Sequence, residues 1–313
     1  MRINVAWLFS TAASLLVLSG HIEAGTTKHV AVIYSDTASY TVRTISGLEW
    51  SLQGSKFKCE ITKYLLKDQD EANKSAIESG APDLLVTIGS RATSFADKEF
   101  PKLPIVFAKV LNPLESGFIQ TWDKPGRHLT GASLDISPEL QMQKFVAVVP
   151  NLKKIGVIYT DNTKRLTDAA KQAAASLGIQ LIPYKVSSSK DLPGAIDSLC
   201  RSVDAIWTVA DEELSTPQFI KYMLLETLRH RIPIMGFNQS FVESGALLCL
   251  EADYKYIGRQ AADIAVAVLN GAEPSRLKPT VPDIVYLYLN LKTSKLLNID
   301  LPPELVNVAK ETY

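Results

Sequence analysis

Apolar runs and stretches of helical spacing alternate along the chain from residue 28 onward. The apolar runs lack the polar alternation of a half-exposed strand, so they predict buried strands. The stretches between them carry apolar residues three and four positions apart, which predicts helices with one buried face. We predict strands at 29–35, 57–65, 82–89, 103–110, 128–135, 153–160, 179–186, 203–210, 232–238 and 283–291. The predicted helices occupy 40–53, 70–79, a stretch beginning near 90, 138–148, 163–177, 192–201, 217–230 and 254–271.

The alternation of strands and helices runs twice. The stretch "KHVAVIYS" at 28–35 opens the first series, and the similar "KKIGVIYT" at 153–160 opens the second. Such alternation forms parallel sheets through right-handed crossovers. The predicted fold class is α/β, with two doubly wound parallel-sheet lobes joined by a hinge. We place lobe one at 26–133 plus 253–273 and lobe two at 134–252 plus 274–313, so the chain crosses between the lobes several times.

The first 24 residues have the pattern of a secretory signal peptide. Arg2 is followed by an apolar core from Val5 to Leu18 and by a short polar stretch that ends at Ala24. The core is too short for a membrane-spanning helix, and no cysteine follows it directly that could carry a lipid anchor. We expect the signal peptide to be cleaved and the mature protein to be periplasmic.

Charge and cysteine content narrow the classes of function. Lys plus Arg and Asp plus Glu both number 33, and this balance argues against binding to nucleic acid or to an acidic membrane surface. The three cysteines do not form a disulfide framework. We expect Cys59, Cys200 and Cys249 to serve as small buried residues, although a bridge between two of them stays open in an oxidising compartment.

Polar residues follow the predicted strands of both lobes. In open parallel sheets, ligands bind outside the carboxyl ends of the strands. Loops after strands are polar in most proteins, so no single position is diagnostic, but six successive strand ends facing one cleft predict a site for a small polar ligand. The candidate contacts are Ser35, Asp36, Tyr40, Ser90, Ala92, Thr93, Asn112, Pro113, Asp161, Asn162, Asp211, Glu212, Asn238 and Gln239.

The charges at these strand ends predict the kind of ligand. The helix that begins near Ser90, its expected N-cap, offers backbone N–H donors and a partial positive charge to a carboxylate. In the second lobe, Asp161, Asp211 and Glu212 suit an ammonium group. A zwitterionic amino acid or a similar metabolite would bridge the lobes, and closure of the lobes would remove it from water. Tyr40 is the aromatic residue that we expect to pack against it.

Motifs for catalysis are missing from the sequence. It has no G-x-G-x-x-G after a strand, no G-x-x-x-x-G-K-[ST] and no G-x-S-x-G. Its four histidines show no metal-ligand spacing. Asp211 and Glu212 are adjacent, so their carboxylates point apart, and the cysteines do not follow strands as a two-cysteine racemase would require. We therefore expect no enzymatic activity, no metal and no cofactor.

Several stretches give the chain a resemblance to a known family. They are "DLLVTIGSRAT", "VLNPLESGF", "LTGASLD", "ESGALLCLEADYKYIGRQAADIAVAVLNGAEPSRLKP" and "LNLKTSKLLNIDLPPEL". Over the whole mature chain the sequence resembles the ABC transporter substrate-binding proteins of the group that includes tryptophan and tyrosine binders. The resemblance implies a type I periplasmic-binding-protein fold, a small-molecule ligand held between the lobes, and an ABC permease in the inner membrane as partner. We expect a monomer.

The resemblance also implies contacts for individual residues. Ser90, Ala92 and Thr93 would meet the ligand carboxylate, and residues 112–113 match the family's Asp-Pro turn. Asp211 falls where the family commonly has an Asp-Asn pair. The chain departs from the family in "GSRAT", which has no Thr-Pro step and adds an arginine, and in "VADEELSTP", which lacks the Asn. The scaffold therefore transfers to this chain, whereas the identity of the ligand does not.

Three functions fit these observations. The chain is the solute-binding component of an ABC importer, or the same fold is a periplasmic ligand sensor whose closed form docks on a signalling receptor. The third function is that of an exported amino-acid racemase or lyase, which would require a thiol or an acid pair exposed in the cleft. A DNA-binding regulator is set aside, because no helix-turn-helix precedes the first strand.

Overall fold

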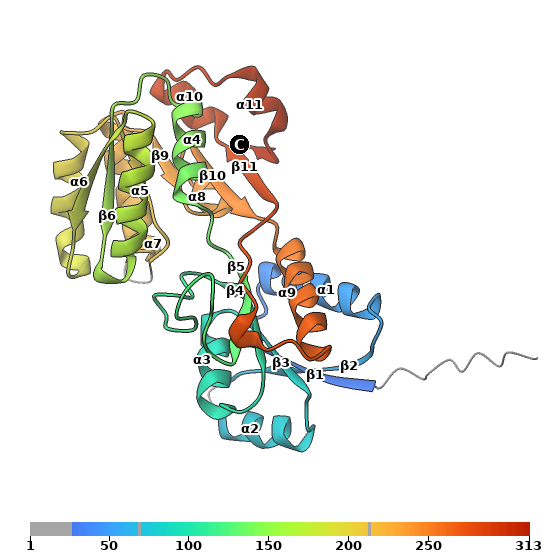
Figure 1. Ribbon diagram of the computed structural model, residues 1–313. Coiled ribbons are helices and arrows are strands. Elements are labelled where there is room, and N and C mark those ends of the chain that lie inside the picture. Colours follow the sequence, from blue (N-terminus) through green and yellow to red (C-terminus); the bar gives the residue numbers. More distant parts are fainter. Residues whose placement is uncertain (1–26, 68–69, 212–213) are drawn as a thin grey trace, which may run out of the picture.

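The computed structural model describes residues 27–67, 70–211 and 214–313, which form two lobes (Figure 1). Each lobe is built on one sheet, fully parallel in lobe one and mainly parallel in lobe two. The predicted α/β class with two parallel-sheet lobes is confirmed. Among the described residues, no helix combines the length and the apolarity needed to cross a bilayer. The predicted signal peptide, 1–24, lies outside the described residues.

Lobe one contains a five-stranded parallel sheet in the order β2-β1-β3-β4-β5. Its strands are β1 (Thr27–Tyr34), β2 (Lys58–Leu65), β3 (Leu84–Ile88), β4 (Ile105–Val110) and β5 (Leu129–Ser133). Its helices are α1 (Ser39–Gln53), α2 (Asp70–Ser79), α3 (Ser90–Glu99) and α9 (Tyr254–Leu269). Val30 and Val32 of β1 pack in the apolar cluster of α1 and α9, whereas Ala31 and Ile33 pack in the cluster on the opposite face. Both faces are buried, which explains the continuous apolar runs.

Helices α1 and α9 lie side by side against one face of this sheet (Figure 1). Two glycines allow the close approach. A Cβ on Gly258 of α9 would overlap the carbonyl oxygen of Thr44, and a Cβ on Gly47 of α1 would overlap that of Lys255. The glycine in "YKYIGRQAA" is therefore a packing residue, and it holds the C-terminal part of the chain on lobe one.

Lobe two contains a seven-stranded sheet in the order β12-β11-β10-β9-β8-β6-β7. Two strands at one edge, β11 and β12, run opposite to the other five, because β11 pairs antiparallel to β10 and parallel to β12. The strands are β6 (Lys154–Tyr159), β7 (Gln180–Lys185), β8 (Ala205–Trp207), β9 (Ile234–Gly236), β10 (Leu248–Ala252), β11 (Val285–Leu289) and β12 (Glu311–Thr312). The helices are α4 (Pro138–Val148), α5 (Lys164–Ser176), α6 (Leu192–Cys200), α7 (Pro217–Arg229), α8 (Gln239–Glu243), α10 (Leu291–Leu297) and α11 (Pro303–Val308), with short 3₁₀ turns η1 (Asp161–Thr163) and η2 (Ser189–Asp191).

Three segments, which we call the crossovers, connect the lobes. They follow β5, β10 and the 3₁₀ turn η3 (Pro274–Arg276). For the third crossover, the predicted lobe boundary at residue 274 can be compared with the contacts of the residues that follow it. Thr280 pairs with Ala132 of β5, and its backbone N–H donates to the Gly131 carbonyl at 2.9 Å. We therefore propose to end the lobe-one portion of the tail near residue 281.

The structure corrects the predicted N-cap of α3 and bears on the three cysteines. Gly89, with φ +89°, occupies the N-cap of α3, and Ser90 is the first helical residue. A positive φ favours glycine, which explains why the apolar run stops there. All three cysteines are free, with Cys200 and Cys249 buried and Cys59 half-buried. The structure thus supports their role as apolar filler and contains no bridge among them.

Candidate functional site

Two adjoining cavities lie at the carboxyl ends of the strands, between the lobes. The first, which we call the aromatic compartment, has a volume of about 360 Å³. It is lined by Tyr40, Lys109, Leu111, Asn112, Leu134, Asp135, Ile136, Gln141, Leu166, Trp207, Thr208, Val209, Ala210, Phe237, Asn238, Leu250, Glu251, Ala252 and Tyr254. The second, the polar compartment, has a volume of about 430 Å³ and is lined by Ser90, Leu111, Asn112, Glu115, Ser116, Asn162, Thr163, Ala210, Asp211 and Ser215. Leu111, Asn112 and Ala210 belong to both, so the two compartments form one site.

Lys109 enters the aromatic compartment from the end of β4. Its backbone has φ +60°, and the pairing of β4 with β5 shifts register between Ala108 and Val110. Val110 packs in the same cluster as Ile105 and Phe107, so Lys109 is the additional residue of a bulge. The bulge turns a charged side chain out of a strand that is otherwise apolar.

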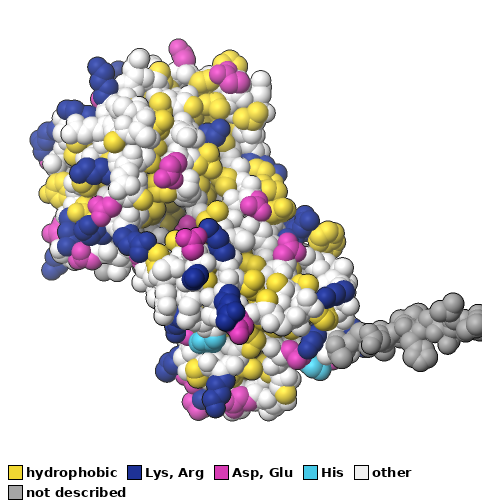
Figure 2. Space-filling model, in the orientation of Figure 1, with side chains coloured by type: hydrophobic (Ala, Val, Ile, Leu, Met, Phe, Trp, Pro, Cys, Tyr) yellow, Lys and Arg dark blue, Asp and Glu magenta, His cyan; other side chains and the backbone are white. Residues whose placement is uncertain are grey.

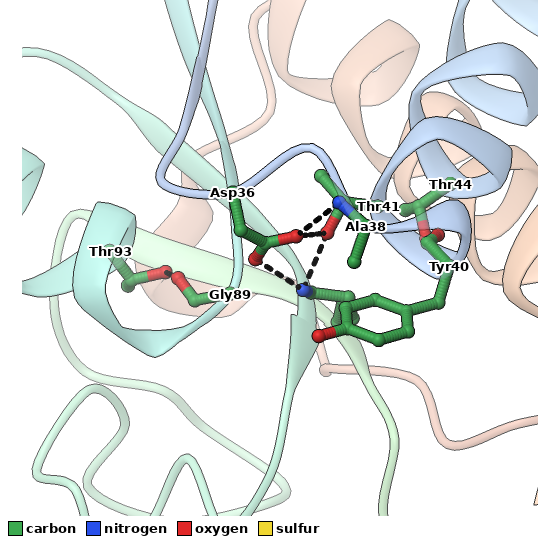
Figure 3. A network of polar contacts seen from close by, with 8 residues as sticks. Asp36, Ala38, Tyr40, Thr41, Thr44, Gly89 and Thr93 are labelled. Carbon is green, nitrogen blue, oxygen red and sulfur yellow. Dashed lines mark hydrogen bonds and ion pairs between the residues drawn. The ribbon is translucent and has the colours of Figure 1, made fainter. Parts of the chain in front are cut away.

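The ammonium group of Lys109 is held by Asp36 of the β1–α1 loop and by the first turn of α1 (Figure 3). Its Nζ donates to Thr41 Oγ1 at 2.7 Å and to Asp36 Oδ2 at 3.2 Å, and lies 4.4 Å from the centre of the Tyr40 ring. Burial lowers the pKa of Lys109, against the opposing charge of Asp36. Asp36 also accepts from Thr41 Oγ1 at 2.6 Å and from the Ala38 N–H at 3.0 Å. Burial raises the pKa of Asp36, but these bonds and the Lys109 charge outweigh it, and the net pKa is lowered.

Two carboxylates enter the same compartment, one from the first crossover and one from the end of β10. Asp135 follows β5, and its Oδ1 accepts from the Asn112 N–H at 2.8 Å. Burial raises the pKa of Asp135 to about 6. Glu251 lies near the end of β10, and its Oε1 accepts from the Tyr254 hydroxyl at 3.1 Å. Burial also raises the pKa of Glu251, more than the bond from Tyr254, a backbone bond from Gln239 and the charge of Arg43 together lower it.

Aromatic side chains form much of the remaining wall. Trp207, the last residue of β8, is only 1% exposed, and its Nε1 donates to Gln141 Oε1 at 2.8 Å, so its polar atom is satisfied. The Tyr254 ring packs against that of Tyr40 with centroids 5.6 Å apart. Phe237 follows β9 and completes the lobe-two side. Figure 2 shows the hollow between the lobes with hydrophobic side chains on its walls, and acidic and basic groups interspersed over the visible face.

The lining of the polar compartment includes four residues that the strand-end rule identifies, Ser90, Asn112, Asn162 and Asp211. Asp211 is 8% exposed and accepts from Thr160 Oγ1 at 2.5 Å and from Thr163 Oγ1 at 3.4 Å. Across the cleft, Arg165 of α5 forms an ion pair with Glu115 of lobe one at 3.1 Å. The lobes are thus in contact through charged side chains beside this compartment.

The structure brings together six of the predicted site residues. Tyr40, Asn112 and Asn238 line the aromatic compartment, and Ser90, Asn112, Asn162 and Asp211 line the polar compartment. The Asn238 side-chain oxygen already accepts from the Phe241 N–H at 2.9 Å, as the N-cap of α8. Glu212 lies outside the described residues.

The other predicted residues do not line either compartment. The Thr93 hydroxyl donates to the Gly89 carbonyl at 2.9 Å and lies 2.8 Å from Thr87 Oγ1, so it faces the core (Figure 3). Two more of the predicted residues, Ala92 and Pro113, are buried within lobe one. Three others contact residues of their own lobe: Asp36 contacts Lys109, Asp161 contacts Lys185, and Gln239 contacts Tyr313. Ser35 is half-buried and also stands apart from both cavities.

Three charged residues of the aromatic compartment are not among the contacts predicted from the sequence. The predicted strand at 103–110 places Lys109 in its interior, because a bulge leaves no mark in the apolar pattern. Glu251 follows the apolar run at 246–250, which lies outside the predicted strands, so the strand-end rule does not reach it. Asp135 could have been found, since it is the last residue of the predicted strand 128–135.

Comparison with known proteins places the chain in a family. Residues 29–313 match the family described as ABC transporter substrate binding protein. The tyrosine-binding protein of Clostridioides difficile is 27% identical over 228 residues, which cover 72% of this chain and 66% of that protein. An uncharacterized protein of Rickettsia prowazekii is 22% identical over 218 residues, 67% of this chain and 65% of that protein. The chain thus spans slightly less than two thirds of the length of these relatives.

Solved structures share the fold. The ligand-free, open structure of a substrate-binding protein with adhesive properties from Clostridium difficile has a TM-score of 0.75 and 22% identity, and covers 91% of this chain and 98% of its own. An ABC domain from Streptococcus pneumoniae in complex with L-Trp has a TM-score of 0.70 and 20% identity, and covers 92% of this chain and 100% of its own. These neighbours have the type I periplasmic-binding-protein fold that the sequence predicted. With the match over residues 29–313, the chain belongs to the ABC transporter substrate-binding protein family.

Proposed function

We propose that this chain is the exported solute-binding component of an ABC importer, and that it binds an amino acid or a similar small polar ligand between its lobes. One observation carries the proposal: a cavity at the strand ends is lined by charged, polar and aromatic side chains of both lobes. Its volume of about 360 Å³ falls in the range of small-molecule sites, about 300–1,000 Å³. The names of a tyrosine-binding relative and of a neighbour in complex with L-Trp support an amino acid as the ligand.

In this proposal the protein works by capture and presentation. A ligand that contacts both lobes favours the closed form, and closure about the crossovers removes it from water. The closed form then docks on a permease in the inner membrane. The mature chain works in the periplasm as a monomer, without catalysis, metal or cofactor.

A thermal-shift screen tests ligand binding. The mature protein is unfolded and refolded to remove carried ligand, and is then heated with each amino acid, with dipeptides and with small carboxylates. A ligand at 100 times its Kd stabilises the native state by about 2.7 kcal/mol, which raises Tm by about 5 °C in a chain of this size. A screen in which no compound raises Tm would contradict the proposal.

A space-filling variant localises the binding. Ala210 lies on the wall common to both compartments, so Ala210→Trp should abolish the ligand-dependent rise in Tm. The matched control is Ala175→Trp, at an exposed position of α5, which should keep the rise. Uptake of the labelled ligand by cells lacking the gene should recover with the wild-type chain and not with Ala210→Trp. Binding with no effect on uptake would contradict the importer role and favour a sensor.

A further inference from the structure

We propose that the aromatic compartment selects a zwitterionic α-amino acid with an apolar or aromatic side chain, with Lys109 binding its carboxylate and Asp135 and Glu251 binding its ammonium group. The inference rests on the proposed function and deepens it. It moves both charge contacts away from the residues expected from the sequence, Ser90 and Asp211, which line the neighbouring polar compartment.

Lys109 is built to present a cation to this compartment. Its side chain is 10% exposed, and a lysine ammonium has three N–H donors. Two of them go to Asp36 and Thr41, which fix its position. The third has no acceptor among the described residues. A left-handed backbone at a non-glycine residue is unfavourable, and such positions cluster at ligand sites. The bulge at Lys109 therefore fits a binding role better than a packing role.

Asp135 and Glu251 supply the opposite charge. Each accepts a hydrogen bond from a neutral group, and neither forms a salt bridge within the part of the chain that the structure describes. A partly buried carboxylate without a cation is unfavourable. An ammonium group placed between them would remove this penalty. Because Lys109 is paired with Asp36, these two carboxylates leave the compartment with excess negative charge, which the ammonium group of a zwitterion offsets while its carboxylate takes the remaining Lys109 donor.

The rest of the wall determines the side chain of the ligand. Phe237 and Leu166 bring half-buried apolar surface from lobe two, backed by the buried Trp207 and Leu250, and the polar atom of Trp207 is satisfied by Gln141. A charged or strongly polar ligand side chain would find no partner on this surface and would lose its hydration. An aliphatic or aromatic side chain would bury apolar area there instead.

Calorimetric titration with three probes separates the two charges. L-phenylalanine carries both, phenethylamine lacks the carboxylate, and 3-phenylpropionate lacks the ammonium group. We expect the wild-type mature chain to bind phenylalanine at least about 10-fold more tightly than either analogue, the loss expected for one charged hydrogen bond. Lys109→Met should weaken phenylalanine by about 10- to 100-fold and leave phenethylamine within about 3-fold. Glu251→Gln and Asp135→Asn should weaken the binding of phenylalanine and of phenethylamine alike and leave the binding of 3-phenylpropionate unchanged.

Controls keep the result interpretable. Lys102→Met, at an exposed position of lobe one, should bind all three probes as the wild type does. Lys109→Met leaves Asp36 without its cation, so Lys109→Met combined with Asp36→Asn is measured beside it, and circular dichroism checks the fold of each variant. Equal weakening of phenylalanine and phenethylamine by both Lys109 variants would overturn the assignment of Lys109. If phenylalanine fails to bind while another compound raises Tm in the screen, this inference fails and the proposed function stands; if nothing binds, both fail.

Discussion

Replacing Asp135 by asparagine should stabilise the ligand-free protein at neutral pH and leave its stability nearly unchanged below about pH 4. Asp135 lies on the first crossover, where burial raises the pKa of its carboxyl from 3.8 to about 6 and the negative charge of Glu115 adds to the rise. The N–H of Asn112 donates to Asp135 Oδ1 and lowers the pKa in part. Asparagine keeps an acceptor oxygen for that N–H but carries no charge.

The sign and size follow from proton linkage. The folded chain holds the Asp135 proton more tightly than the unfolded chain, so the free energy of unfolding falls as pH rises from about 4 to about 6 and is level above that. At 1.36 kcal/mol per pH unit, the difference between 3.8 and about 6 corresponds to about 3 kcal/mol. This value is an upper limit, because a half-buried carboxylate retains part of its hydration. The variant lacks this penalty.

Urea unfolding at pH 4, 5, 6, 7 and 8 measures the effect. The gap between Asp135→Asn and the wild type should be close to zero at pH 4 and should open between pH 4 and 6. Asp161→Asn is the control, because Asp161 is 78% exposed and its ion pair with Lys185 is worth less than about 1 kcal/mol. A gap that is the same at every pH, or a variant less stable than the wild type at pH 8, would refute the reasoning.

Two further predictions concern packing and thiol chemistry. Gly258→Ala should destabilise the protein by about 1–3 kcal/mol in urea unfolding, because its Cβ would overlap the backbone of α1. The control, Gly194→Ala, has open space around it in α6 and should be neutral or stabilising. Equal effects of the two substitutions would contradict the close α1–α9 contact. Iodoacetamide at pH 8 should label the native protein at Cys59 and spare Cys200 and Cys249, as read by mass spectrometry. Both spared cysteines are buried, and burial raises the pKa of each thiol, that of Cys200 to about 11. Rapid labelling of Cys200 or Cys249 would reopen the question of a reactive thiol in this fold.

The fold was predictable because its signals are local and periodic. Strands buried on both faces give unbroken apolar runs, as Val30–Ile33 do in β1, and amphipathic helices give spacings of three and four. The strand β10 is not predicted, because its short apolar run passes into the start of α9 with no glycine or proline between them. The short elements α8, α10, α11 and β12 rest on tertiary contacts, such as the pairing of β12 with β11, that no local pattern specifies.

The site was predictable only in part, for a physical reason. The strand-end rule finds loops that reach the cleft, and it found Tyr40, Asn112 and Asn238. It cannot tell which loop side chains are used within the lobe, as the Thr93 hydroxyl is by the Gly89 carbonyl. Nor can it find Lys109, because a bulge depends on the register of two strands.

The placement of the missed carboxylates bears on how binding and closure are coupled. Asp135 and Glu251 lie beside the first two crossovers, the segments about which the lobes would move. In the absence of a cation, burial disfavours the charged form of both carboxylates, and any motion that exposes them to water is favoured. An ammonium group between them reverses this preference, since it pairs the charges and is itself better shielded when the lobes close. The same two side chains that would recognise the ligand would then also favour the closed form, so ligands without an ammonium group should fail to close the lobes even where they bind.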